Sequence, residues 1–391
     1  MSIDCHGFNK RDNGQGMMTQ KRSLIWQWFV DDKIEPGNVK AAMLVAYPHP
    51  TASEWQLLIA NILLYLGVLL LSAGVIFFMA FNWDALSHLN KFAIVEVIFA
   101  LFIGGFYLVN HAQKKHHSQS SLPSTHNQDS QHNQHIQQTY GWSLPNAMLL
   151  GASIMLGALL ALVGQTYQTG ADPWQLFAIW AVVILPFAYI AGFDLLWLLV
   201  VVLLNVSLGL YLQSFASVFS FLLEDIQQIA IVGLANLAIH LLFTLAKRWQ
   251  WRGQLRFNCP IVEATSLLAS LSAFTWLIVW VIFDFSYDYD SSEHVIYYAL
   301  LYLAILSSLF VWYRYRSPSL YPLTLVLTSI STAIVSLLSR ELLDSHDPIG
   351  GFFLIAMVVI GLTSGSLYWL KQLQKEFAQT ATLNSEEAAH E

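Results

Sequence analysis

The chain has 391 residues, of which 56% are hydrophobic and only 11% are charged, with a formal net charge of −7. Soluble globular proteins carry about 25% charged residues, so this composition excludes an ordinary soluble domain. The two cysteines, Cys5 and Cys259, exclude a disulfide framework and have no metal-ligand spacing.

Long apolar runs recur along the chain, and each is long enough to cross a hydrocarbon core of about 30 Å. The runs are continuous rather than alternating, so they predict helices and not the strands of a barrel. We therefore expect an all-α fold, a polytopic transmembrane helical bundle of about ten spans. The expected spans are 55–81, 92–110, 146–164, 174–192, 194–213, 226–246, 262–283, 295–313, 320–338 and 350–370.

The polar stretches around these spans predict the rest of the organisation. We expect residues 1–20 to be disordered and residues 21–50 to form a cytoplasmic amphipathic helical hairpin, which either packs on the bundle or docks a partner. The bundle itself covers 51–370, and it is interrupted at 111–141 by a disordered cytoplasmic loop rich in His and Gln. A solvated linker explains this loop better than a metal site, because no helix fixes the spacing of its histidines. A cytoplasmic tail follows at 371–391.

The distribution of Lys and Arg predicts the orientation of the chain. With ten spans both termini lie on the same side, and Lys91 and Arg340 then lie on the opposite side from the other 16 of the 18 basic residues. Because basic residues are retained in the cytoplasm, both termini are expected to be cytoplasmic.

Two outward-facing connections are rich in hydrogen-bonding groups, at 81–87 and 164–177. Helix initiation explains part of the second, because Asp172 is a natural N-cap, Pro173 suits the first helical position and Gln175 completes a capping-box-like pair. The remaining polar groups either satisfy exposed backbone at the interface or line an outward-open vestibule. The six candidate substrate-binding residues are Asn82, Asp84, Gln165, Tyr167, Gln168 and Asp172.

Three ionisable residues fall within the expected spans: Glu96, His240 and Glu263. A charge at mid-bilayer costs roughly 2.5–3.5 kcal/mol, so each is a candidate functional group, although Glu96 and Glu263 are near enough to the span ends to reach water. His240 lies four residues after Asn236, on the same helix face. It either forms a hydrogen bond within the bundle, to Asn236 or Asn205, or joins a proton relay with Glu96 and Glu263.

No nucleophile–base pair or carboxylate pair at one depth is evident, so we expect no enzyme, no catalytic residue, no cofactor and no metal site. The expected partners are the lipid bilayer and, in one alternative, another membrane protein of the cell envelope, with no nucleic acid. Two functions stay open. One is a transporter or permease with an outward vestibule, and the other is a non-catalytic scaffold or accessory subunit of an envelope complex.

The turn Phe-Asn-Trp-Asp-Ala-Leu-Ser at 81–87 and the segment Gly-Gln-Thr-Tyr-Gln-Thr-Gly-Ala-Asp-Pro-Trp-Gln-Leu-Phe at 164–177 resemble those of a family of bacterial predicted membrane proteins, domain of unknown function 2157. The resemblance covers about residues 20–340. It implies a multi-pass protein of the bacterial inner membrane. It assigns no catalytic residue, because the family has no established activity, and the loop at 111–139 departs from the family's compact pattern.

Overall fold

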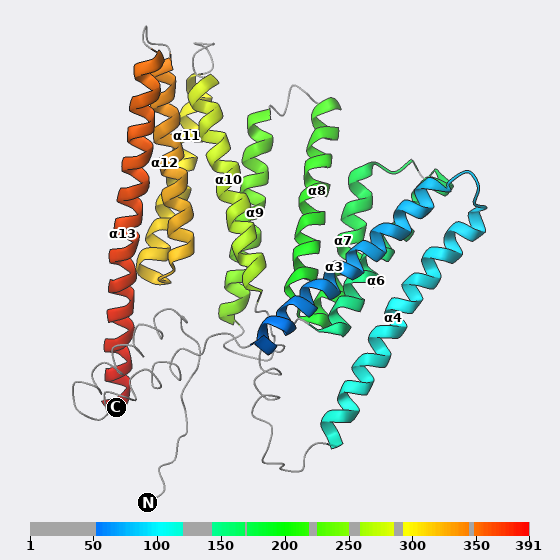
Figure 1. The fold of residues 1–391 in the computed structure, drawn as a ribbon. Coiled ribbons are helices and arrows are strands. Elements are labelled where there is room, and N and C mark those ends of the chain that lie inside the picture. The colour runs from blue at the N-terminus through cyan, green and yellow to red at the C-terminus, as the bar shows by residue number, and fades with distance from the viewer. Residues whose placement is uncertain are drawn as a thin grey trace, which may run out of the picture. The chain divides into compact units, whose positions relative to one another are not determined.

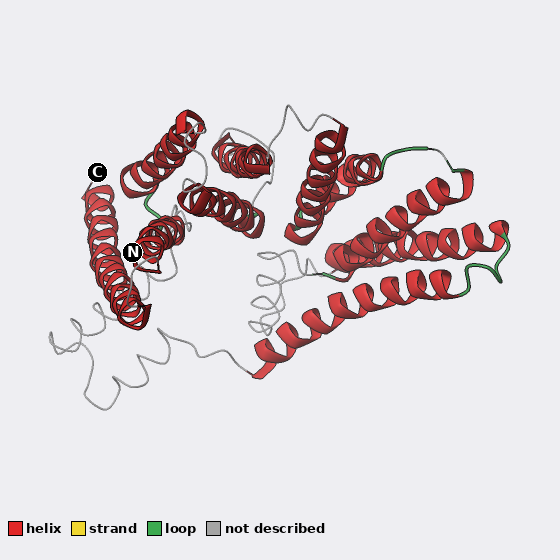
Figure 2. Cartoon of the chain, turned by 90° about the horizontal axis from the view of Figure 1, so that it is seen from above, coloured by secondary structure: helices red, strands yellow, loops and turns green. Residues whose placement is uncertain are grey.

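The structure is a computed structural model that describes residues 52–119, 143–168, 170–218, 225–249, 259–284, 292–343 and 348–390. Within these residues it consists of α-helices and one π-helical turn, without a strand (Figures 1 and 2). Ten helices of the described residues are long and apolar enough to cross a membrane, which confirms the predicted polytopic all-α fold. The predicted segments 1–20 and 21–50, and most of the loop at 111–141, lie outside the described residues.

The helices agree closely with the predicted spans, and the largest extensions beyond them are those of α4 and α13. α4 continues to Gln119, into the region expected to be a loop, and α13 continues to His390, through the expected tail. In chain order the helices are α3 (Ala52–Phe81), α4 (His88–Gln119), α6 (Leu144–Tyr167), α7 (Pro173–Ala191), α8 (Asp194–Val218), α9 (Asp225–Trp249), α10 (Pro260–Asp284), α11 (Ser292–Val311), the π-helical turn η4 (Trp312–Arg316), α12 (Leu320–Leu343) and α13 (Pro348–His390).

The break between α7 and α8 occupies only two residues. Gly192 has a φ of 54°, in the left-handed region that favours glycine, and its N–H donates to the Ala188 carbonyl oxygen at 3.1 Å, which ends α7. The carbonyl oxygen of Phe193 then accepts the N–H of Leu196 at 3.2 Å, which begins α8. Two separate helices are therefore confirmed at a boundary that the sequence marks only weakly.

The chain divides into two compact units. One consists of residues 56–302, and the other consists of residues 303–391 together with the N-terminal 55 residues. In the 56–302 unit, α6 packs on α4 and α7, and α8 packs on α7, α9 and α10. Buried side chains from α3, α4, α6, α7 and α8 form its main apolar core.

Tyr65 connects α3 to this core. Its hydroxyl donates to the Ser143 carbonyl oxygen at 3.1 Å and accepts the Ser143 N–H at 3.2 Å, just before α6 begins. Its ring stacks on Phe193 with the centroids 5.1 Å apart. One side chain of α3 thus contacts both the start of α6 and the turn between α7 and α8.

A glycine allows α6 and α7 to approach closely. A Cβ atom at Gly157 would lie 2.2 Å from the ring of Trp180, so no larger residue fits without displacing the indole. The Trp180 indole N–H donates to the Ser153 carbonyl oxygen of α6 at 2.8 Å. The contact between these helices therefore combines a small residue with an interhelical hydrogen bond.

In the 303–391 unit, α12 packs along α13. The rings of Phe310 on α11 and Trp369 on α13 stack with their centroids 5.9 Å apart. A salt bridge of 2.6 Å joins Arg314 in η4 to Glu376 on α13. These contacts fix the end of α11 against the C-terminal half of α13.

Candidate functional site

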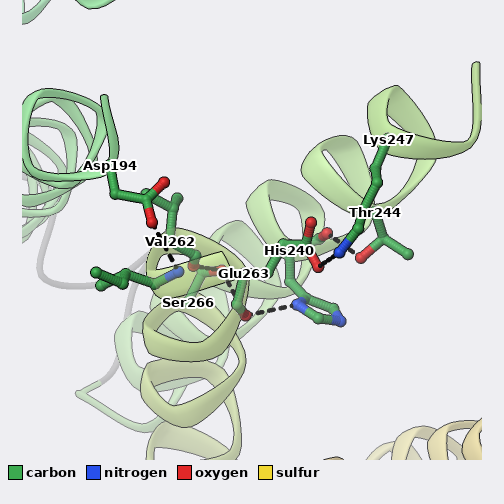
Figure 3. Close-up of polar contacts among 8 residues, drawn as sticks. Asp194, His240, Thr244, Lys247, Val262, Glu263 and Ser266 are labelled. Atoms are coloured by element: carbon green, nitrogen blue, oxygen red, sulfur yellow. Dashed lines mark hydrogen bonds and ion pairs between the residues drawn. The ribbon is translucent and has the colours of Figure 1, made fainter. Parts of the chain in front are cut away.

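Polar side chains gather where α8 and α10 begin and α9 ends, all within the 56–302 unit. Figure 3 shows Asp194 from the first turn of α8, His240 and Lys247 from α9, and Glu263 from the first turn of α10. Because these residues lie far apart in the sequence, helix packing and not a local motif builds the cluster, which we name the α8–α10 polar cluster.

One face of α9 carries a stripe of polar residues. Asn236, His240, Thr244 and Lys247 follow one another at intervals of four, four and three residues, which place them on one face of a helix. At a rise of 1.5 Å per residue the stripe is about 16 Å long, roughly half of a hydrocarbon core. Asn236 and His240 are 1% and 3% exposed, whereas the Lys247 side chain is 46% exposed. The stripe therefore runs from an accessible helix end into the protein interior.

The buried end of the stripe is a pair of side-chain amides. Asn205 Nδ2 donates to Asn236 Oδ1 at 3.2 Å, and Asn236 Nδ2 donates to Asn205 Oδ1 at 2.6 Å. Each amide nitrogen also donates to a carbonyl oxygen one turn earlier in its own helix, at 2.9 Å. This reciprocal pair joins α8 to α9, and the predicted hydrogen bond between Asn236 and His240 is replaced by it.

His240 instead contacts the main chain of α10. Its Nδ1 lies 2.8 Å from the carbonyl oxygen of Glu263. A carbonyl oxygen only accepts, so Nδ1 carries the hydrogen and donates it. In the neutral ring the Nε2 atom is then the nitrogen that gains or loses a proton. The structure thus brings together two of the three predicted intramembrane residues. The side chain of His240 contacts the main chain of Glu263.

The Glu263 carboxylate has two different environments. Its Oε2 lies 3.2 Å from the Nζ of Lys247, in an ion pair whose Lys side is close to half exposed. Its Oε1 is buried, and no hydrogen-bond partner for it exists among the residues that the structure describes. A buried carboxylate oxygen without a donor is costly, so this atom is a natural place for a proton or a cation.

Asp194 lies at the start of two helices at once. It is the first residue of α8, and its Oδ2 accepts the N–H of Ile261 from the first turn of α10 at 3.4 Å. The residue is 8% exposed, and its Oδ1 is buried with no hydrogen-bond partner in the described part of the chain. The positive ends of two helix dipoles favour a negative charge at this position, which explains how a carboxylate is tolerated there.

Cys259, immediately before α10, completes the surroundings of Asp194. The residue is 1% exposed, and burial raises the pKa of its thiol, with the nearby Asp194 charge raising it further. The thiol therefore stays protonated at neutral pH beside the Asp194 carboxylate.

The arrangement is suited to holding a proton. With both carboxylates ionised, Lys247 charged and His240 neutral, the α8–α10 polar cluster carries one excess negative charge, and one added proton neutralises it. In the described ranges no group of three or more His, Cys, Asp or Glu residues is placed to hold a metal ion.

The first outward segment makes local contacts. Asn82 Nδ2 donates to the Phe78 carbonyl oxygen at 2.9 Å and so helps to end α3, while Asp84 is exposed in the turn. Lys91, which is only 4% exposed, places its Nζ 3.7 Å from the ring centroid of Trp83. A cation–π contact therefore accommodates this basic residue, which lies in the first turn of α4.

The second outward segment is largely exposed. Gln165 and Tyr167 project from the last turn of α6, where the Tyr167 ring lies 6.3 Å from that of Phe92. Gln168 ends the helix with a left-handed φ of 44°. Their exposure fits residues at the membrane–water interface, and an outward vestibule stays a prediction.

The predicted side-chain cap at Asp172 is wrong. Asp172 does occupy the N-cap position of α7, but its carboxylate makes no capping bond. Its Oδ2 accepts the Trp174 indole N–H at 3.3 Å instead, and Gln175 donates its N–H to the Asp172 main-chain oxygen at 3.0 Å. The nearby indole thus competes successfully for the carboxylate that the capping box requires.

The six outward candidates are not joined to one another by any hydrogen bond of the described residues, and their role in binding stays a prediction. Glu96 is also separate from the α8–α10 polar cluster. It is exposed on α4, a helix that packs on α6, whereas His240 and Glu263 lie on α9 and α10. The structure therefore brings His240 and Glu263 together without Glu96, and a proton relay stays a prediction.

Sequence reasoning missed Asp194, Lys247 and Cys259 as members of the cluster. Asp194 directly follows a Gly-Phe break, so it resembles an ordinary acidic residue in a first helical turn. Only the packing of α10 on α8 reveals that its carboxylate contacts the second helix N-terminus.

Comparisons with known proteins give one match. No curated protein and no solved structure matches the chain. The matched stretch is shorter than the expected 20–340 and ends within the first turn of α8, so it includes Asp194 and both outward segments. Residues 27–197 match the family described as "Predicted membrane protein (DUF2157)", which confirms the family resemblance over this part of the chain.

Proposed function

We propose that this protein is a transport-type protein of the inner membrane, which moves a small solute and exchanges a proton at the α8–α10 polar cluster. The 16 to 2 distribution of Lys and Arg supports cytoplasmic termini. In that orientation the cluster faces the cytoplasm, and the segments 81–87 and 164–177 face outward.

One observation carries the proposal: Asp194 and Glu263, on two packed helices, each have a buried carboxylate oxygen without a hydrogen-bond partner in the described residues. Ionisable groups inside membrane-spanning bundles are expensive, and they mark ion and proton pathways more often than structural contacts. A proton bound at either oxygen removes the excess charge of the cluster. Release of that proton restores the ionised state stabilised by Lys247 and two helix N-termini.

His240 extends the proposed site from the end of α9 into the protein interior. It lies between the accessible Lys247 and the buried amide pair of Asn205 and Asn236, on the polar face of α9. Because Nδ1 donates to the Glu263 carbonyl oxygen, Nε2 is the atom that takes part in proton transfer. The ring thus extends the proton-accepting region from the helix end toward mid-membrane.

The outward residues are the proposed opposite entrance for the solute. Gln165, Tyr167, Gln168 and Asp172 are all exposed, so they are accessible to a ligand from water. Asn82 and Asp84 lie in the turn that leads into α4. In alternating access a central site opens to one side of the membrane at a time, and the outward residues and the α8–α10 polar cluster would then lie toward its two openings.

The alternative function is a non-catalytic scaffold in an envelope complex. It is favoured by the number of polar groups that already have partners, above all the reciprocal pair of Asn205 and Asn236. Interhelical hydrogen bonds of this kind hold membrane bundles together without any transport. The scaffold reading does not account for the two orphan carboxylate oxygens.

Reconstitution tests the proposal. The full-length protein is incorporated into liposomes that contain the pH-sensitive dye pyranine and is exposed to a panel of amino acids, sugars and small carboxylic acids. We expect one class of solute to drive proton movement. Asp194→Asn and Glu263→Gln should slow this movement by at least about tenfold, because each removes a proton-exchanging group.

Glu96→Gln is the matched control, since Glu96 is an exposed carboxylate within a span, and its rate should stay within about twofold of the parent. Thermal-shift measurements with the same panel on Tyr167→Ala and Asp172→Ala test the outward entrance separately. Proton movement that persists in both cluster variants, or no response to any solute, would favour the scaffold.

A further inference from the structure

The end of α11 carries a basic and aromatic segment that the proposed function does not use. Residues Trp312–Arg316 read Trp-Tyr-Arg-Tyr-Arg and form the π-helical turn η4, within the 303–391 unit. π-Helical turns are rare in proteins, but those that occur often lie at functional sites. They change the direction of the side chains within a helix. Trp and Tyr are also the residues that favour the membrane–water interface.

A groove of about 570 Å³ opens on this part of the chain. It is lined by Ser307, Ser308, Val311, Trp312, Tyr315 and Arg316.

The lining of the groove is mainly apolar. Val311 and Tyr315 are 55% and 73% exposed. The hydroxyls of Ser307 and Ser308 donate to carbonyl oxygens of their own helix at 3.1 and 2.9 Å, so they do not require a polar ligand. The groove can therefore accept a hydrocarbon chain along most of its length.

The two arginines of η4 are in different states. Arg314 forms its salt bridge with Glu376 and lies 5.6 Å from the ring of Phe377, so α13 occupies it. Arg316 is exposed at the end of the groove, and among the described residues it forms no salt bridge. One guanidinium is thus available to an external anion.

The surroundings of this groove are basic. Lys371 and Lys375 are exposed on α13, in the stretch that leads to Glu376 beside Arg314. In Figure 1 the lower half of α13 continues past the ends of α11 and α12. By the distribution of Lys and Arg, this end of the unit lies at the cytoplasmic leaflet, where anionic lipid headgroups are found.

We propose that this groove binds one anionic phospholipid of the cytoplasmic leaflet. The lipid phosphate pairs with the Arg316 guanidinium, whose planar fork matches phosphate geometry. One acyl chain lies along Val311 and the helix face of Ser307 and Ser308. Trp312 and Tyr315 flank the boundary between the headgroup and the chain.

Native mass spectrometry of the full-length protein in detergent tests this proposal, with phosphatidylglycerol and phosphatidylcholine of the same chain length added separately. We expect one phosphatidylglycerol to bind in preference to phosphatidylcholine. Arg316→Gln should weaken phosphatidylglycerol binding about fivefold, the effect of one basic contact to an anionic lipid. Val311→Trp, which fills the groove and keeps every charge, should weaken both lipids.

Lys371→Gln is the matched control, because it removes an equal charge from the same end of the unit but not from the groove. Its binding should stay within about twofold of the parent. Equal loss in Arg316→Gln and Lys371→Gln would show diffuse attraction and overturn the site. Equal binding of the two lipids, or a dimer that excludes both, would overturn it as well.

Discussion

The 56–302 unit carries polar residues in two regions that are built in opposite ways. In the segments 81–87 and 164–177 the polar residues are consecutive in the sequence, and the hydrogen bonds of their side chains are local, as with Asn82 and Phe78. Only a main-chain oxygen, that of Trp174, is seen to accept from a neighbouring helix, from Ser207 of α8 among the described residues. In the α8–α10 polar cluster the residues are widely separated, and their hydrogen bonds cross between helices, as with His240 and Glu263. Density of polar residues in sequence is thus a poor guide to where side chains converge.

The difference has a physical cause. A short connection between two helices is wet, so each polar group in it finds water or its own backbone and has no need of a distant partner. A polar group on a helix within lipid has no water and must find a partner on a neighbouring helix. Convergence is therefore expected inside the bundle and at helix ends that are covered.

The largest effect is expected from breaking the buried amide pair. Asn236→Leu leaves the Asn205 amide without its partner and should lower the free energy of unfolding by about 2 kcal/mol. Asn82→Leu in the outward turn should have a much smaller effect. Thermal melting of both variants in detergent measures the difference.

The double variant Asn205→Leu with Asn236→Leu serves as the control, because an apolar pair leaves no orphan polar atom. It should recover part of the lost stability. Additive losses would contradict the view that the two amides act as one unit.

Gly157→Ala tests whether the close approach of α6 and α7 stabilises the fold. The new Cβ would overlap the Trp180 ring, and the indole must move from its hydrogen bond to Ser153, at a cost of about 1–2 kcal/mol. Intrinsic fluorescence and melting temperature should both change.

Gly164→Ala, on the same helix with nothing within 4 Å of its Cβ position, is the control and should be close to neutral. If the two glycine variants behave alike, the close approach of α6 and α7 does not contribute to stability.

An aspartate in each of the two regions allows a direct comparison of their effects on stability. Asp194→Ala removes the carboxylate that accepts the Ile261 N–H at the start of α10, and it should destabilise the fold by about 1 kcal/mol, as the loss of a helix cap does. Asp172→Ala should be close to neutral, because that carboxylate is exposed and does not cap α7. A chemical-denaturation series in detergent compares the two, and a larger effect at Asp172 would reverse the comparison.

The smallest expected effect is a pH dependence from Cys259. The folded state raises the pKa of this thiol, so the unfolded chain releases the proton first as the pH rises. The contribution is present below the unfolded pKa of about 8.5 and is lost above it, by about 0.8 kcal/mol between pH 7 and pH 9. Melting temperatures across this range should fall less steeply for Cys259→Ala than for the parent. Parallel curves would show that the thiol is not buried next to Asp194.

Much of the fold could be predicted from sequence, because each span must satisfy its own backbone in lipid. The ten spans follow from that constraint, whereas the break at Gly192 is marked only weakly in the sequence. The pairing of helices does not follow from it, since apolar faces of similar composition fit one another in many ways. Pairing is what brings Asp194 to Ile261 and leaves Glu96 exposed on α4. The sequence allowed an interaction between His240 and Glu263 to be predicted. It did not predict that His240 would contact the main-chain carbonyl oxygen of Glu263.

The two-residue connection between α7 and α8 has a mechanical consequence. Gly192 and Phe193 leave no slack, Phe193 is fully buried against Tyr65, and α7 packs along α8. We therefore expect that any movement of α8 carries α7 with it. Any opening between α8 and α10 stretches the bond from Ile261 to Asp194, and the helix pair carries that carboxylate away with it. Under the proposed function, proton exchange at Asp194 would then depend on the movement of this helix pair.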